Sequence, residues 1–294
     1  MESVSNRFAF RILAPALLLC ATVCARAPDN PVADGDYAYQ QGNYAKAIQS
    51  YREGANDDRL PELQATAQDR LGRMFSNGDG VAQDAKQAIS WFEKSDALGN
   101  IEAPTDIGDI YFFARGVPRN LPTAVRWYRK GADRGSPHGM GQLAWCYLNA
   151  MGVDKNVAEA RALYLKLAQL GNDLGAYQSG WIFEHVEPTD YAQAMNWYLQ
   201  AAAQNYALAK NNIGYMYEHG MGVKKNYATA AHWYEQAANA GDKRGQYHLG
   251  LLYEQGLGVD KNLEKAIALM RMSAKAGNQE AVQWLTTRSI GFEL

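Results

Sequence analysis

The feature that most constrains this chain is a segment that recurs along most of its length. One copy reads NIGYMYEHGMGVKKN and ends at Asn226, and the others combine the same apolar positions with a turn rich in glycine. We align the copies on one apolar or small position in their first half and call it the repeat anchor. The repeat anchors are Leu71, Ile107, Leu143, Ser179, Ile213 and Leu249, which are separated by 36, 36, 36, 34 and 36 residues. This period, with two helical patterns in each copy, predicts a solenoid of stacked helix pairs.

The turn itself contains glycines and lysines, which raises the alternative of a phosphate-binding loop. Such a loop needs a preceding strand, a longer glycine spacing, and Ser or Thr after its lysine. Here Lys225 is followed by Asn226, and no strand-like alternation precedes the turn. Because the glycines recur in nearly every copy, we interpret them as residues that let the chain turn between two helices.

Local signals agree with two helices in each repeat. In the first helix, Ala209, Ile213, Gly214 and Tyr217 fall on one helical face. The glycine beside the repeat anchor lacks a Cβ atom and should let a neighbouring helix approach closely. The second helix should begin at an Asp or Asn N-cap. These predicted N-caps are Asp84, Asn120, Asn156, Asp190, Asn226 and Asn262.

A large residue lies seven positions after each of these N-caps and is expected to anchor the core. These residues are Trp91, Trp127, Leu163, Trp197, Trp233 and Leu269. The second helix should then end at a glycine in the left-handed C′ position. The glycines are Gly99, Gly135, Gly171, Gly241 and Gly277, and a fresh N-cap is predicted directly after them at Asn100, Ser136, Asn172, Asp242 and Asn278.

The ends of the repeat array differ from its middle. Residues 34–57 have a short turn and are predicted to form a leading helix pair, six repeats cover about 60–277, and residues 278–288 should form a single capping helix. Atypical ends are expected because an exposed apolar face would associate. No low-complexity block divides the array, so we predict one all-α superhelical solenoid over residues 34–294, preceded by a linker at 26–33.

The first 25 residues have the composition of a secretory signal. Arg7 and Arg11 precede an apolar run from Ile12 to Val23, and small residues follow, which indicates processing after Ala25. The run is too short for a permanent membrane span. A lipid anchor on Cys20 or Cys24 is disfavoured, since Leu19 and Val23 are not the small residues expected before a modified cysteine. We expect export, with the periplasm as the destination and a eukaryotic secretory lumen as the open alternative.

Charge and cysteine content exclude several function classes. The net charge is −2 and 20% of residues are charged, which does not indicate a nucleic-acid partner. After processing, Cys146 would be the only cysteine, so no intramolecular disulfide is expected and packing must stabilise the fold. No integral membrane segment is predicted in the mature chain.

These motifs resemble the Sel-one-like repeat family, a variant of the tetratricopeptide repeat with a longer turn. The resemblance rests on the LGxMY and GxGV motifs, the Asp or Asn cap, and the AxxGN or AxxGD exit, and it covers about Asp34 to Arg288. It implies a right-handed superhelix whose first helices line a concave face, and adaptor or regulatory proteins that bind other proteins. A cysteine-rich branch is linked to β-lactam chemistry, but this chain lacks those cysteines.

No pattern in the sequence indicates an enzyme, a metal or a cofactor. His185 and His219 occupy equivalent places beside Glu184 and Glu218. Equivalent atoms on stacked helices lie roughly 8–10 Å apart, whereas ligands must converge on an ion about 2 Å away. We therefore interpret these residues as solvated helix ends and Cys146 as a buried, inert residue.

Aromatic residues supply the candidate binding site. Trp145, Trp181 and Tyr215 lie two positions after the repeat anchor, where the other repeats carry Arg, Asp or Leu. We call these three residues the aromatic row. By analogy with tetratricopeptide repeats, they should face the groove and bind a partner, because Trp and Tyr dominate interface hot spots. Neighbouring positions add Tyr177, Tyr247, Phe112 and Phe113 to the candidates, with gap filling between helices as the alternative.

Two function classes follow. The first is an exported interaction module that binds a protein or peptide on its concave face, as an adaptor, a regulator or an inhibitor such as an immunity protein against a toxic effector. The second is an enzyme or ligand receptor that acts on cell-wall glycopeptide.

Overall fold

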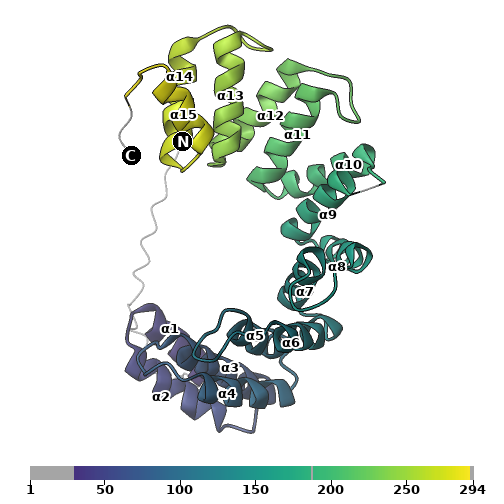
Figure 1. Cartoon of the computed structure of the whole chain (residues 1–294). Coiled ribbons are helices and arrows are strands. Elements are labelled where there is room, and N and C mark those ends of the chain that lie inside the picture. Colours follow the sequence, from purple (N-terminus) through teal and green to yellow (C-terminus); the bar gives the residue numbers. More distant parts are fainter. Residues whose placement is uncertain (1–29, 187, 292–294) are drawn as a thin grey trace, which may run out of the picture.

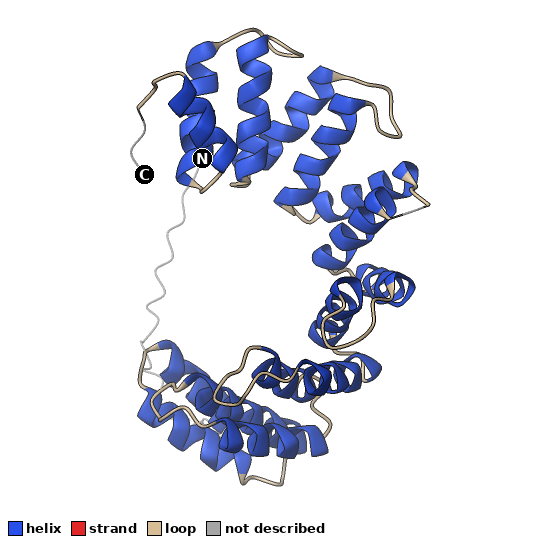
Figure 2. Ribbon diagram, viewed as in Figure 1, coloured by secondary structure: helices blue, strands red, loops and turns tan. Residues whose placement is uncertain are grey.

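The computed structural model describes residues 30–186 and 188–291, so the signal predicted at 1–25 lies outside the described residues. Within those ranges the chain forms fifteen helices and no strand (Figure 2). The first helices of the pairs are α1 (Pro31–Gln40), α3 (Pro61–Asn77), α5 (Ala103–Phe112), α7 (Pro137–Asn149), α9 (Asp173–His185), α11 (Ala207–His219) and α13 (Lys243–Gln255). The second helices are α2 (Tyr44–Ala55), α4 (Ala85–Ala97), α6 (Leu121–Asp133), α8 (Val157–Gln169), α10 (Tyr191–Ala203), α12 (Tyr227–Asn239) and α14 (Leu263–Lys275), and α15 (Gln279–Thr287) closes the stack. The predicted all-α solenoid of helix pairs is confirmed.

The helices begin where the sequence predicts, with two exceptions. All six N-caps predicted for the second helices accept backbone N–H groups with their side chains. Asn100 instead accepts from the Glu102 N–H at 2.9 Å, and α5 begins only at Ala103. Its prediction as an N-cap was therefore wrong. At the other end of the array, α1 begins at Pro31, within the predicted linker.

In the six repeats, the second helix ends as expected at a residue in the left-handed conformation. The five predicted C′ glycines have φ angles between 80° and 95°, a region that an L side chain rarely adopts. In the fourth repeat, Asn205 takes this place with a φ of 66°. Asparagine is the common non-glycine solution for such a position.

The helix pairs stack into an open arc (Figure 1). Besides neighbours in sequence, contacts join α1 with α3, α3 with α5, α5 with α7, and α11 with α13, and all of these are first helices. The first helices therefore form the inner, concave side of the arc. In Figure 1, α7 and α9 lie nearer the central opening than α8 and α10.

The buried core position differs from the predicted one. Each predicted anchor, such as Trp127, is only half-buried, and the fully enclosed side chain is the residue after it. Trp127 instead packs against a cluster that includes Phe75 and Phe92 of the preceding repeat, and it therefore contributes to the interface between the two repeats. The enclosed residues are Phe92, Tyr128, Tyr164, Tyr198, Tyr234 and Met270.

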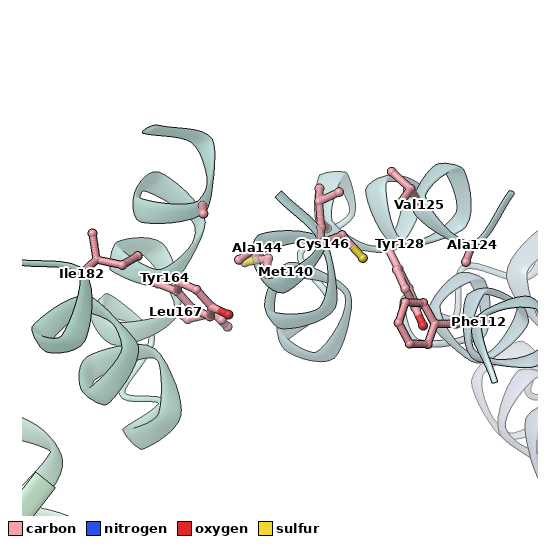
Figure 3. Close-up of a cluster of buried hydrophobic side chains, with 13 residues drawn as sticks. Phe112, Ala124, Val125, Tyr128, Met140, Ala144, Cys146, Tyr164, Leu167 and Ile182 are labelled. Carbon is pink, nitrogen blue, oxygen red and sulfur yellow. The ribbon is translucent and has the colours of Figure 1, made fainter. Parts of the chain in front are cut away.

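The glycine beside the repeat anchor makes room for this enclosed ring. A Cβ atom on Gly214 would lie 2.7 Å from the Tyr234 ring, and one on Gly108 would lie 2.6 Å from the Tyr128 ring. In the third repeat the place of the glycine is taken by Ala144. Figure 3 shows Ala144 in the same cluster as Tyr164 and Tyr128. The predicted close approach at this glycine is confirmed.

The array ends in a helix that covers the last pair. Trp284 and Leu285 of α15 are 6% and 0% exposed, and they pack in one cluster with Met270 and Ala274 of α14. The Trp284 indole also donates a hydrogen bond of 2.9 Å to Glu254. Across the described part of the chain, none of the helices has the length and apolar character needed to span a membrane.

Candidate functional site

The aromatic row lies on three consecutive first helices and remains accessible. Trp145 on α7 and Tyr215 on α11 are 38% and 37% exposed, and Trp181 on α9 is half-buried. The repeat anchors two positions before Trp145 and Tyr215 are at most 4% exposed. Trp181 also packs against the core cluster that contains Tyr164, and all three rings keep surface that a ligand could contact.

Each member of the row is held by a neighbour rather than by another member. The Trp145 ring contacts Phe112 edge-on at a centroid distance of 5.8 Å. Trp181 stacks on His185 at 4.8 Å, and Tyr215 stacks on His219 at 3.9 Å. Both histidines lie one helical turn after their aromatic partner, so two repeats present the same aromatic–imidazole pair.

Two of the other candidates do not face the groove as expected. Phe112 and Tyr177 are each 8% exposed and belong to core clusters. Tyr177 packs between the rings of Tyr198 and Tyr206, at 5.8 and 5.0 Å. These two residues fill gaps between helices, which was the alternative interpretation.

The remaining two candidates keep some accessible surface. Phe113 is 52% exposed at the end of α5, and the Arg115 guanidinium lies 5.3 Å from its ring centroid. Tyr247 is half-buried and packs against the cluster that contains Trp284. Neither touches a member of the aromatic row through a ring contact within the described residues.

The two Glu–His pairs considered as metal ligands have structural roles. Glu184, 7% exposed, accepts a hydrogen bond of 2.5 Å from the Tyr198 hydroxyl, and Glu218 accepts one of 2.6 Å from Tyr234. Among the described residues, no group of three His, Cys, Asp or Glu side chains converges on a possible ion position. Cys146 is fully buried, and burial raises the pKa of its thiol to about 11.

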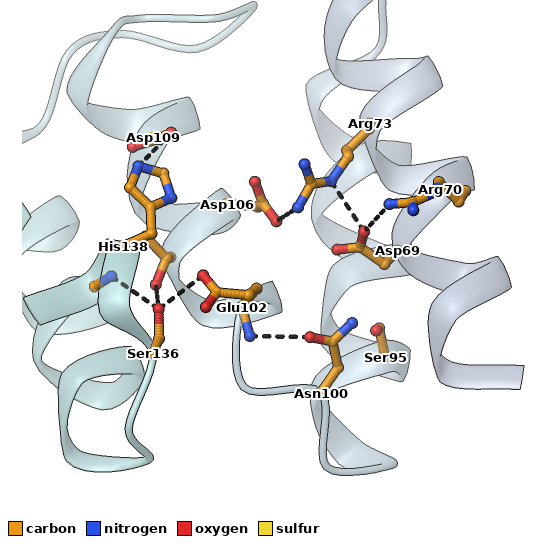
Figure 4. Close-up of polar contacts among 12 residues, drawn as sticks. Asp69, Arg70, Arg73, Ser95, Asn100, Glu102, Asp106, Asp109, Ser136 and His138 are labelled. Carbon is orange, nitrogen blue, oxygen red and sulfur yellow. Dashed lines mark hydrogen bonds and ion pairs between the residues drawn. The ribbon is translucent and has the colours of Figure 1, made fainter. Parts of the chain in front are cut away.

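Charged residues occupy the N-terminal part of the concave face. Arg73 on α3 donates hydrogen bonds of 2.9 Å both to Asp69 in its own helix and to Asp106 on α5 (Figure 4). Burial raises the pKa of the Asp106 carboxyl, although Arg73 counteracts this effect. One repeat further, His138 lies 3.8 Å from Asp109. These contacts link successive first helices, although the Oδ1 atom of Asp69 is buried without a hydrogen-bond partner among the described residues.

The middle of the concave face has a different character, with a neutral groove between α7 and α9. The groove has a volume of about 400 Å³. None of its lining residues is Asp, Glu, Lys or Arg. We call it the α7–α9 groove, and its lining residues are Pro137, His138, Gly141, Gln142, Trp145, Tyr164, Leu167, Asn172, Leu174 and Gln178.

Of the residues that line this groove, Trp145 was predicted from the sequence as a binding residue, whereas Gly141 and Tyr164 were not. Gly141 lies two positions before the repeat anchor, where other repeats carry Asp69, Thr105 or Tyr177. An added Cβ atom at Gly141 would meet only Leu167, at 3.8 Å, so the missing side chain leaves open space. This departure from the other repeats was readable in the sequence.

Comparison with known proteins identifies the repeat. Six consecutive segments match the Sel1 repeat, at residues 65–100, 102–136, 137–172, 173–206, 207–242 and 243–278. Among curated proteins, no sequence matches this chain.

Solved structures show the same fold. A Sel1 repeat protein from Oxalobacter formigenes is 23% identical with a TM-score of 0.69, and the match covers 83% of this chain and 97% of that one. A protective antigen of uropathogenic Escherichia coli with an SLR fold is 26% identical with a TM-score of 0.56, over 90% of this chain and 66% of that one. An immunity protein of Pseudomonas aeruginosa is 19% identical over 72% of this chain and 81% of that one, and its TM-score of 0.46 supports no argument about function.

Proposed function

Because this chain belongs to the Sel1 repeat family, whose members generally mediate protein–protein interaction, we propose that it is an exported interaction module. It binds an extended segment of a protein partner along the concave face. The observation that carries this proposal is the aromatic row, which places Trp145, Trp181 and Tyr215 at one repeated position on α7, α9 and α11. All three are accessible, although the fold does not require aromatic residues there.

The ring contacts around the aromatic row indicate that the site is preformed. His185, His219 and Phe112 hold the three rings in place before any ligand arrives. A rigid aromatic side chain loses little conformational freedom when it binds, which is why such residues dominate interface energetics. The charged side chains in the N-terminal part of the concave face already contact one another. We therefore assign the affinity for the partner to the middle of that face, where the aromatic row lies.

Affinity capture tests the proposal. Residues 26–294 would be immobilised and exposed to a periplasmic extract, and bound proteins would be identified by mass spectrometry. The Trp145→Ala/Trp181→Ala double variant should lose a partner that the unmodified chain retains. Tyr44→Ala serves as the matched control, because Tyr44 is 36% exposed but lies on a second helix, α2. Equal capture by both variants would exclude the aromatic row as the site.

The inhibitor form is a narrower version of the same proposal. If the captured partner is an enzyme such as a lipase-like toxin, adding residues 26–294 should lower its activity in proportion to complex formation. If the partner keeps full activity in the complex, the chain is an adaptor instead. Both outcomes leave the interaction module intact and decide only its form.

A further inference from the structure

The enclosed tyrosines of the stack differ in whether their hydroxyl groups have a hydrogen-bond partner. Four of them donate a hydrogen bond from the hydroxyl to a carboxylate, at 2.5–2.8 Å. These pairs are Tyr51–Asp36, Tyr128–Asp109, Tyr198–Glu184 and Tyr234–Glu218. Tyr164 is the equivalent residue of the third repeat and is only 2% exposed, yet its hydroxyl has no hydrogen-bond partner within the described residues.

The missing partner has a sequence-level cause. Where the tyrosine is paired, the carboxylate lies either two positions after the repeat anchor, as Asp109 does, or five positions after it, as Glu184 does. In the third repeat these two positions carry Trp145 and Leu148. The third repeat therefore carries a member of the aromatic row at the first position and an apolar residue at the second, so neither position supplies an acceptor for Tyr164.

The Tyr164 hydroxyl is available to a ligand in the α7–α9 groove. Tyr164 lines that groove together with Leu167 and Trp145. A side-chain oxygen that has no partner and is fully enclosed would count among the buried unpaired atoms, and the Tyr164 oxygen does not. The small exposed part of Tyr164 therefore includes its hydroxyl. A nearly buried donor without an internal acceptor favours a ligand that brings one.

The residues that line the groove favour an uncharged ligand group. Its lining combines the apolar surfaces of Trp145, Leu167 and Leu174 with polar groups. The polar groups are the amides of Gln142, Asn172 and Gln178 and the imidazole of His138. The lining contains no Lys or Arg, and the imidazole of His138 already lies 3.8 Å from the Asp109 carboxylate. A carboxylate placed beside Tyr164 would therefore be desolvated without a free counter-charge, which is strongly unfavourable. A hydroxyl group can instead accept the hydrogen bond at little cost in desolvation.

We propose that the α7–α9 groove is a socket for a tyrosine side chain of the partner. Its ring would lie between Trp145 and Leu174, and its hydroxyl oxygen would accept a hydrogen bond from Tyr164. This inference deepens the proposed function and rests on it, since it names the chemical group that the interaction module recognises. The open space over Gly141 is what admits the ring.

The test uses p-cresol, the side-chain analogue of tyrosine, with toluene as the analogue that lacks the hydroxyl. Each is titrated into residues 26–294, and the NMR shifts of the Trp145 indole N–H and the Leu167 methyl groups are followed. We expect p-cresol to bind more tightly than toluene by on the order of fivefold, the usual net value of one hydrogen bond. Tyr164→Phe should remove this preference and leave toluene binding unchanged.

Two further variants complete the design. Gly141→Leu places a side chain in the groove, where its Cβ atom meets only Leu167 at ordinary contact distance, and it should abolish binding of both probes in a folded protein. Tyr234→Phe removes a paired hydroxyl elsewhere and should leave both titrations unchanged. Equal binding of the two probes, or a p-cresol preference that survives Tyr164→Phe, would overturn the socket. Absence of p-cresol binding would also overturn the proposed socket. In that case, partner capture that is still lost in the Trp145→Ala/Trp181→Ala variant would show that the proposed function stands.

Discussion

The hydroxyl of Tyr128 donates a hydrogen bond of 2.8 Å to Asp109, a carboxylate that is only 7% exposed. Removing that donor leaves the Oδ1 atom of Asp109 without this hydrogen bond, so Tyr128→Phe should lower the free energy of unfolding by about 1–3 kcal/mol. Tyr164→Phe removes a hydroxyl without an internal acceptor and should change it by less than about 0.5 kcal/mol. Urea unfolding followed by circular dichroism measures both. Similar losses in the two variants would contradict the difference between these tyrosines.

The aromatic row should contribute more to binding than to folding. Replacing Trp145 and Trp181 by alanine should weaken partner binding by at least about 2 kcal/mol, the scale of a hot-spot truncation. Because Trp145 is 38% exposed and Trp181 is half-buried, the loss of stability should stay below the roughly 3–5 kcal/mol per site that a fully buried Trp would show. Melting curves and calorimetric titration of the same double variant separate the two effects. A variant that unfolds at room temperature would assign both residues to the core.

Stability should depend on the ionisation of Asp106. Burial raises the pKa of this carboxyl to about 8 against the opposing effect of Arg73, whereas in the unfolded chain it ionises near pH 4. The folded state therefore retains a proton that the unfolded state releases. The resulting contribution to stability is fully present below pH 4 and is lost as the pH rises through 8.

Asp106→Asn removes this titration while keeping a neutral side chain of the same shape. Its stability relative to the unmodified chain should rise by about 1.4 kcal/mol per pH unit between pH 5 and pH 8, or roughly 4 kcal/mol in all, and then level off toward pH 9. The exposed Asp260, changed to Asn, is the control and should show no such trend. Thermal melts at several pH values provide the measurement, and a difference that falls with rising pH would refute the assignment.

The closing helix should be needed to keep the array monomeric. Deleting residues 278–294 removes Trp284 and Leu285 from the apolar face of α14 and exposes Met270 and Ala274. We expect association or a lower melting temperature, measured by light scattering and circular dichroism. Deleting only residues 289–294 keeps α15 and should have a much smaller effect. A monomeric, equally stable chain without α15 would show that the helix has no capping role.

Export predicts a processed N-terminus. N-terminal sequencing of protein recovered from the periplasm should begin at Arg26, after the small-residue exit of the predicted signal. Processing there would leave Cys20 and Cys24 in the removed segment. Mature protein that retains Met1 would rule out this signal.

Much of the fold could be predicted because each repeat encodes it locally. The cap before α12 at Asn226 and the left-handed glycine at Gly241 depend on a few adjacent residues, and they recur with the period of the stack. The solenoid follows from that repetition, since each helix pair can bury its apolar face only against its neighbours. The position of the aromatic row on the first helices was predictable for the same reason.

Packing between repeats was decided only by the tertiary structure. The sequence pattern assigned the core to Trp127, but its neighbour Tyr128 is the enclosed residue, because the space left by Gly108 receives that ring. Likewise, Phe112 and Tyr177 share the helical face expected for the site, yet adjacent helices cover them. The α7–α9 groove exists because the space above Gly141 is open, and its one proposed hydrogen-bond donor is the Tyr164 hydroxyl, which has no acceptor within the described residues. Both features are visible only in the tertiary structure. Periodicity determines which residues share a face, whereas burial depends on the distances between helices, and those are set by side-chain packing across the whole stack.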